Sequence, residues 1–160
     1  MTSRHLRVRW PLLALLGVVV IWGGVSAWRR ARRETEILAV TTCPFFGPPR
    51  TTMGANVAPD DTAFVRVHEE VHAAQCRQYG PFAYRWRNVI PKGKLALEVP
   101  AYCAAARARL RIGMDTVRVR DRLIDDVTEA LSDVADSSRV LAALRENCGE
   151  IVRSVGRGKG

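Results

Sequence analysis

Apolar side chains recur every three or four residues through most of the chain after residue 58, a spacing that predicts amphipathic helices. Prolines and glycines mark where these helices begin and end. Pro100 would damage a helix interior, so the third helix is expected to begin near Leu97, which puts the proline in its first turn. The expected helices cover residues 59–80, 81–90, 95–112, 115–135 and 138–155.

Two of these helices carry apolar faces that predict how they pack. On the helix at 59–80 the expected face consists of Phe64, Val67, Val71 and Ala74. On the helix at 115–135 it consists of Val117, Ile124, Val127, Leu131 and Val134. A chain of 160 residues is one domain by length and can bury a modest core, against which both faces would pack.

The stretch before the first of these helices predicts strands instead. Residues 36–41 read as a short strand, and residues 51–58 as a weaker one that Gly54 interrupts. A loop rich in proline and glycine, residues 44–49, separates the two. The expected fold class is therefore α+β and mostly α.

The N-terminal end has a different pattern. The segment from Trp10 to Trp28 contains no charged side chain, and its terminal indoles suit the two interfaces of a membrane. The small residues at 25–27 leave a cleaved signal peptide as the alternative, although the apolar run is longer than a usual signal core. The expected organisation is a basic segment at 1–9, a transmembrane anchor at 10–28, a basic linker at 29–35, the folded domain at 36–155 and a disordered tail at 156–160.

The net charge of +9, taken alone, is typical of a nucleic-acid-binding protein. The positions of the basic residues do not support this interpretation. The excess lies beside the apolar segment and in the C-terminal tail. Residues 34–150 hold 15 basic and 16 acidic side chains, a balance of −1. Binding to nucleic acid is therefore not expected.

One stretch carries candidate chemistry: residues 68–72 match the zinc-metallopeptidase pattern H-E-x-x-H and contain two of the three histidines in the chain. On a helix, His68 and His72 share a face and can direct one imidazole nitrogen each at a single ion. Glu69 lies about 100° round the helix, where it can accept a proton from a water whose pKa zinc lowers toward ~7. Glu70 lies about 200° round the helix from His68, so its side chain should point away from the ion. The alternative is an exposed amphipathic helix that carries these letters by chance.

Two histidines need a third protein ligand, with a fourth position left open for water. No histidine follows His72, so the ligand must be of another type. Glu98, at the start of the next long helix, is the better candidate, and Cys76, one turn beyond His72, is the alternative. The alternative role for Glu98 is that of a first-turn carboxylate favoured by the helix dipole. Gln75 is expected to support the site.

The order His68-Glu69-x-x-His72 and then Glu98-x-x-Ala101 resembles the gluzincins, and residues 51–110 resemble small, mostly uncharacterised bacterial H-E-x-x-H-x-x-Q proteins. The resemblance covers about 60 of 160 residues. It implies a minimal zincin-like, zinc-dependent peptidase domain with His68, His72 and Glu98 as metal ligands and Glu69 as general base and acid. An edge strand before the motif, on which an extended peptide could pair, belongs to the same pattern.

Tyr102 departs from that pattern, because it stands where many gluzincins have an acidic residue that orients a histidine. It lies one turn after Glu98, so it is the first candidate to stabilise the oxyanion, ahead of Tyr84, Tyr79 or an arginine. The expected function is a membrane-anchored zinc endopeptidase acting on a peptide or protein. The alternatives are a catalytically inactive binding or scaffold protein with the same fold, and a structural membrane protein without metal.

The four cysteines, Cys43, Cys76, Cys103 and Cys148, are scattered, which suits disulfides in an oxidising compartment. They favour an outward-facing domain at a bacterial inner membrane, or a secreted one if the N-terminal segment is cleaved. Four reduced thiols in a cytosolic protein are the alternative. If the two metal-binding helices converge on one zinc, Cys76 is expected to pair with Cys103, which leaves Cys43 for Cys148.

Overall fold

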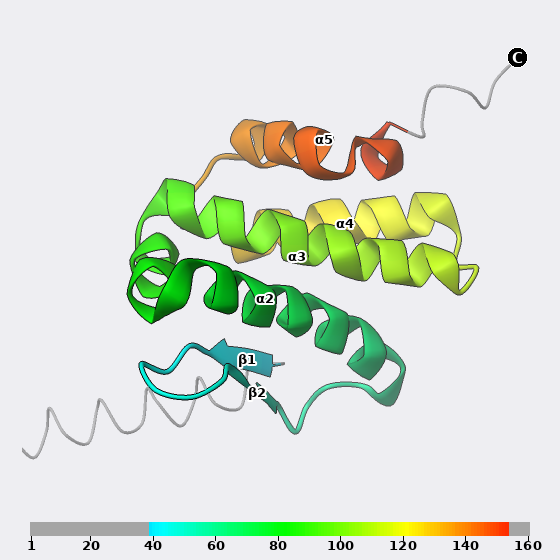
Figure 1. The fold of residues 1–160 in the computed structure, drawn as a ribbon. Coiled ribbons are helices and arrows are strands. Elements are labelled where there is room, and N and C mark those ends of the chain that lie inside the picture. Colours follow the sequence, from blue (N-terminus) through cyan, green and yellow to red (C-terminus); the bar gives the residue numbers. More distant parts are fainter. Residues whose placement is uncertain (1–38, 154–160) are drawn as a thin grey trace, which may run out of the picture. The chain divides into compact units, whose positions relative to one another are not determined.

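The computed structural model describes residues 39–153, so the predicted basic segment, anchor, linker and C-terminal tail lie outside the described residues. Within the described range, no helix is both long enough and apolar enough to cross a membrane. Four helices and a two-stranded sheet make up this part of the chain, which confirms the α+β, mostly helical class. The elements are β1 (Ala39–Thr42), β2 (Arg50–Met53), α2 (Pro59–Val89), α3 (Pro91–Arg111), α4 (Thr116–Ala130) and α5 (Ser137–Val152) (Figure 1).

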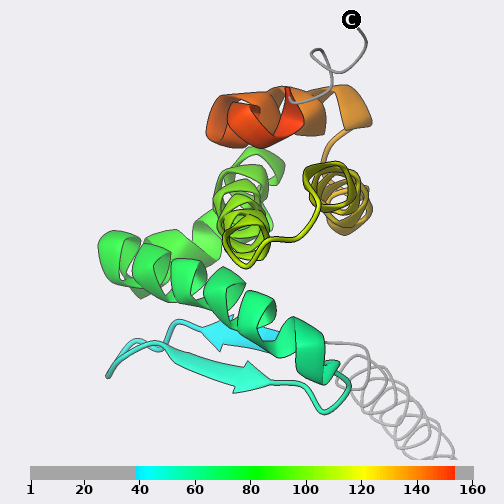
Figure 2. The ribbon, with the colours of Figure 1, turned by 90° about the vertical axis from the view of Figure 1, so that its right-hand side faces the viewer.

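The two strands form an antiparallel hairpin that lies along α2 (Figure 2). Thr41 lies opposite Thr51 in the pairing, and its hydroxyl donates a hydrogen bond to the carbonyl of Glu69 at 3.2 Å. The hairpin is thereby attached to the turn of α2 that carries the motif. β2 ends at Met53 rather than at residue 58, because Gly54 has no side chain to pack on a sheet.

The predicted break at Gly80-Pro81 is a kink within α2. Gly80 has φ 74° and ψ 165°, a backbone conformation that other residues rarely adopt, and helix resumes on its far side. The predicted apolar face is wrong at Ala74, which is exposed. Apart from Phe64, the residues that α2 buries before the kink are Glu69, His72, Gln75 and Cys76.

α3 begins at Pro91, six residues before the expected start, so Pro100 lies in its interior. The expectation was wrong because residues on both sides of Pro100 are packed in the interior. Leu97, Val99 and Ala101 are at most 1% exposed. Burial of Leu97 and Val99, at about 1.5–3 kcal/mol each, offsets the ~3 kcal/mol that an interior proline costs.

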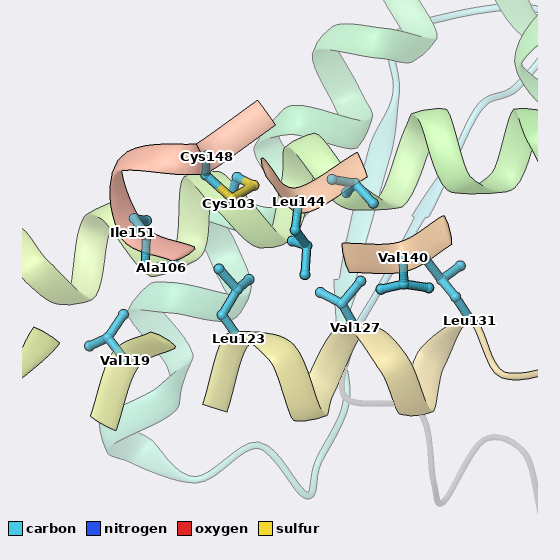
Figure 3. Close-up of a cluster of buried hydrophobic side chains, with 11 residues drawn as sticks. Cys103, Ala106, Val119, Leu123, Val127, Leu131, Val140, Leu144, Cys148 and Ile151 are labelled. Atoms are coloured by element: carbon cyan, nitrogen blue, oxygen red, sulfur yellow. A yellow bond between two sulfur atoms is a disulfide. The ribbon is translucent and has the colours of Figure 1, made fainter. Parts of the chain in front are cut away.

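The main core lies between α3, α4 and α5 (Figure 3). Asp115 caps α4 by accepting a hydrogen bond from the backbone of Arg118 at 2.9 Å, and this fixes where the helix begins. Val119 then faces the core, whereas Val117, about 200° away on the helix, is 51% exposed. The predicted face of α4 is therefore wrong at Val117. The core residues of this cluster are Val99, Cys103, Ala106, Val119, Leu123, Val127, Leu131, Val140, Leu144, Cys148 and Ile151.

Disulfides join Cys43 to Cys76 and Cys103 to Cys148, with Cα–Cα distances of 5.7 and 5.8 Å. The expected pairing of Cys76 with Cys103, and of Cys43 with Cys148, is wrong. The reason is rotational: Cys103 follows Glu98 by five residues, or about 140° round α3, so it leaves the site and enters the core shared with α5. Cys76 instead packs with Cys43 at the end of β1.

Candidate metal centre

Three ligand-type atoms converge between α2 and α3. His68 and His72 lie one turn apart on α2, and their Nε2 atoms are 3.0 Å from each other. Each Nε2 lies 3.4 Å from Oε2 of Glu98, which projects from α3. All three ligand atoms lie within 4.8 Å of one another, so the group could hold a single metal ion.

Gln75 connects this group to the facing helix. Its side-chain Oε1 lies 2.9 Å from Nδ1 of His72, and its Nε2 donates to the carbonyl of Leu97 at 2.9 Å. A proton on Nδ1 of His72 therefore has an acceptor, and this tautomer leaves the lone pair of Nε2 free for a metal. The expectation that Gln75 supports the site is consistent with this position. Its contact with Leu97, 22 residues away, has no signal in the sequence.

The electrostatics of the group favour a positive charge at its centre. Burial raises the pKa of Glu98, but hydrogen bonds from His68 and His72 lower it by more, to about 2. Burial lowers the pKa of His72, yet the Glu98 carboxylate, Gln75 and Glu69 together raise it above its ordinary value. The site thus stabilises a cation, a role that a proton and a metal ion can both fill.

Glu69 is 6% exposed, and its Oε2 is buried without a hydrogen-bond partner among the described residues. A buried carboxylate oxygen without a partner is costly, and such groups are rare in folded proteins. Its charge also contributes to the raised pKa of His72. Two imidazole nitrogens and one carboxylate, with this second carboxylate on the helix that carries the histidines, fit a divalent metal with a bound water.

Two tyrosines flank the histidines. The ring of Tyr102 meets that of His68 edge-on at 4.5 Å between centroids, and Tyr84 approaches His72 at 6.4 Å. Burial, together with the charges of Glu98 and Glu69, raises the pKa of Tyr84 to about 12. Burial and the Glu98 carboxylate also raise the pKa of Tyr102. Both phenols therefore keep their protons at neutral pH and can donate hydrogen bonds.

The remaining predicted residues lie away from the group. Cys76, the alternative third ligand, is bonded to Cys43 and offers no thiolate. Tyr79, a weaker candidate donor, packs against the guanidinium of Arg87 at 4.4 Å. Glu70 is exposed, on the side of α2 away from the ligand atoms, as its helical position predicts.

Comparison with family models, with curated proteins and with solved structures finds no match to this chain. Its function is therefore inferred from the geometry and chemistry of the site itself.

Proposed function

We propose that this chain is a zinc-dependent peptidase with a gluzincin-like site. The observation that supports it best is the convergence of His68, His72 and Glu98. On the same helix as the histidines, Glu69 has a buried carboxylate oxygen with no hydrogen-bond partner among the described residues. Two nitrogens and one oxygen from protein, with a further position open, are the ligands of many catalytic zinc sites. Zinc held there would act as a Lewis acid and lower the pKa of a bound water.

Glu69 is the proposed general base and acid. Its buried carboxylate takes a proton from the attacking water and transfers it to the leaving nitrogen of the peptide. The Thr41 hydroxyl donates a hydrogen bond to the backbone carbonyl of Glu69, which attaches this turn of α2 to the hairpin. A protein that only binds zinc would not need Glu69, because Glu69 is not one of the three ligand-type groups. A peptidase needs this carboxylate as its general base.

Tyr102 is the proposed donor to the oxyanion that forms when water attacks the peptide carbonyl. It lies one turn after Glu98 and touches His68, and its raised pKa keeps it protonated. Tyr84 is the second candidate, beside His72. A peptide could reach the site in extended form along the hairpin, because each strand of a two-stranded sheet has an outer edge that can pair.

A peptide library incubated with the zinc-loaded full chain tests the proposal. We expect cleavage products by mass spectrometry, and at least about a thousandfold slower cleavage for Glu69→Gln, given the size of general-base effects. Glu70→Gln, on the exposed side of α2, is the matched control and should cleave at the wild-type rate. Zinc binding without any cleavage above the Glu69→Gln background would contradict the peptidase and favour a binding or scaffold protein.

A further inference from the structure

Exposed apolar side chains run along α2 beyond the kink. Phe82, Trp86 and Val89 are 74%, 60% and 75% exposed. Steps of four and three residues place them on one side of the helix, and Tyr84, on the other side, is buried. Single exposed apolar residues are ordinary, but a contiguous group of large ones marks an interaction surface.

The loop between β1 and β2 extends this surface. Phe45 and Phe46 are 57% and 92% exposed. The guanidinium of Arg85, on α2, lies 4.5 Å over the ring of Phe45, so the loop and the end of α2 are adjacent, as Figure 1 also shows. We call Phe45, Phe46, Phe82, Trp86 and Val89 together the aromatic face.

The two stretches that carry the aromatic face contain no acidic side chain. Neither residues 37–59 nor residues 71–97 contain an aspartate or a glutamate. Both stretches contain exposed basic side chains, and none of the ion pairs within residues 39–153 uses them. These basic residues are Arg50, Arg77, Arg85, Arg87 and Lys92. Tryptophan and phenylalanine beside arginine and lysine are typical of helices that lie on the headgroups of an anionic membrane.

We propose that the aromatic face docks on an anionic lipid surface, as a second contact besides the predicted anchor at 10–28. Only residues 29–38 separate that predicted span from β1, and ten extended residues reach at most about 35 Å. The domain is then held near the bilayer, where a high effective concentration makes a weak contact sufficient. A second copy of the chain is a poorer occupant, because its basic side chains would meet those of the first.

Fluorescence of Trp86 tests the docking. The full chain carrying Trp10→Phe, Trp22→Phe and Trp28→Phe keeps this one indole, and it is added to vesicles of phosphatidylcholine with or without phosphatidylglycerol, all with brominated acyl chains. We expect the Trp86 emission to shift to the blue and to be quenched with phosphatidylglycerol, and the quenching to weaken as salt is raised.

Arg50→Gln with Lys92→Gln removes two charges whose side chains take part in no ion pair within the described residues. Each basic residue near an anionic surface changes the equilibrium constant for docking about fivefold, so the loss of two should lower it roughly 30-fold. Arg118→Gln with Arg145→Gln, exposed on α4 and α5, is the matched control and should leave it unchanged. The proposal would be overturned if Trp86 emission stayed unquenched in the anionic vesicles, or if the two double variants had equal effects. A blue shift that depends on protein concentration and comes without quenching would also overturn it, because it would indicate self-association. Docking does not depend on the metal, so His68→Ala should dock like the wild type.

Discussion

The side-chain oxygen of Gln75 lies 2.9 Å from Nδ1 of His72, on the opposite side of the imidazole from Glu98. This contact determines which nitrogen of His72 carries the proton and which can bind a metal. The amide of Gln75 also bonds the carbonyl of Leu97, so one side chain holds the histidine and ties α2 to α3.

Gln75→Ala should weaken zinc binding by about 10- to 100-fold, because His72 loses the group that fixes its tautomer and ring orientation. Competition with a chromogenic chelator measures the change in dissociation constant. Gln78→Ala, an exposed change one turn along the same helix, is the control. Equal affinities for the two variants would mean that Gln75 does not orient the ligand.

Glu98→Ala should weaken zinc binding far more than Glu70→Ala. Glu98 lies 3.4 Å from both histidine nitrogens, whereas Glu70 is exposed on the side of α2 away from them. Calorimetric titration of each variant with zinc compares them directly. Similar dissociation constants for both variants would exclude Glu98 as the third ligand.

Much of the candidate site was predictable from the sequence because helix geometry relates residues one turn apart. Residues one turn apart share a face, so the motif brings His68 and His72 together wherever the helix lies. The choice of Glu98 needed only the assumption that the next long helix faces the first. Tyr102 follows Glu98 by one turn, and the same geometry brings it to His68.

The remaining details depend on rotation about helix axes and on long-range packing, which the sequence pattern does not determine. Cys103 was expected near the site, but a rotation of about 140° from Glu98 takes it to Cys148. Pro100 was expected in a first turn, but dense packing of its neighbours places it in the interior of α3. The Asp115 cap determines how α4 is rotated about its axis. The predicted apolar face of this helix therefore wrongly included Val117.

Peptide mapping without reduction should recover the pairs Cys43–Cys76 and Cys103–Cys148 from protein isolated from the cells that naturally make it. Their sequence separations of 33 and 45 residues correspond to about 4 kcal/mol of unfolding free energy each in the chain-entropy model. Replacing either pair by serines should therefore lower the denaturation midpoint strongly. Four thiols that react freely after unfolding would contradict the pairing and an oxidising compartment.

Asp61 should stabilise the fold in a manner that depends on pH. Burial raises the pKa of Asp61, but Arg122 and the buried Arg109 lower it by more, so it lies below its ordinary value. The stabilisation is thus present above the unfolded pKa of ~3.9 and is lost as the pH falls through the folded value. Asp61→Asn should cost about 1–3 kcal/mol at neutral pH, because Arg109 loses a charged partner.

Urea denaturation at several pH values measures this, with Asp60→Asn, an exposed neighbour, as the control. The difference between wild type and Asp61→Asn should shrink as the pH falls below about 4. A difference that stays constant down to the acid limit would show that the ion pair is not its cause.

The metal content of the purified full chain decides whether the proposed zinc site exists. We expect elemental mass spectrometry to find one zinc per chain. That zinc should be lost in His68→Ala and in His72→Ala and fully retained in Glu69→Gln, since the first two residues bind the ion and Glu69 acts on water. A chain that takes up no zinc, or a His68→Ala variant that keeps its full zinc content, would contradict the proposed site.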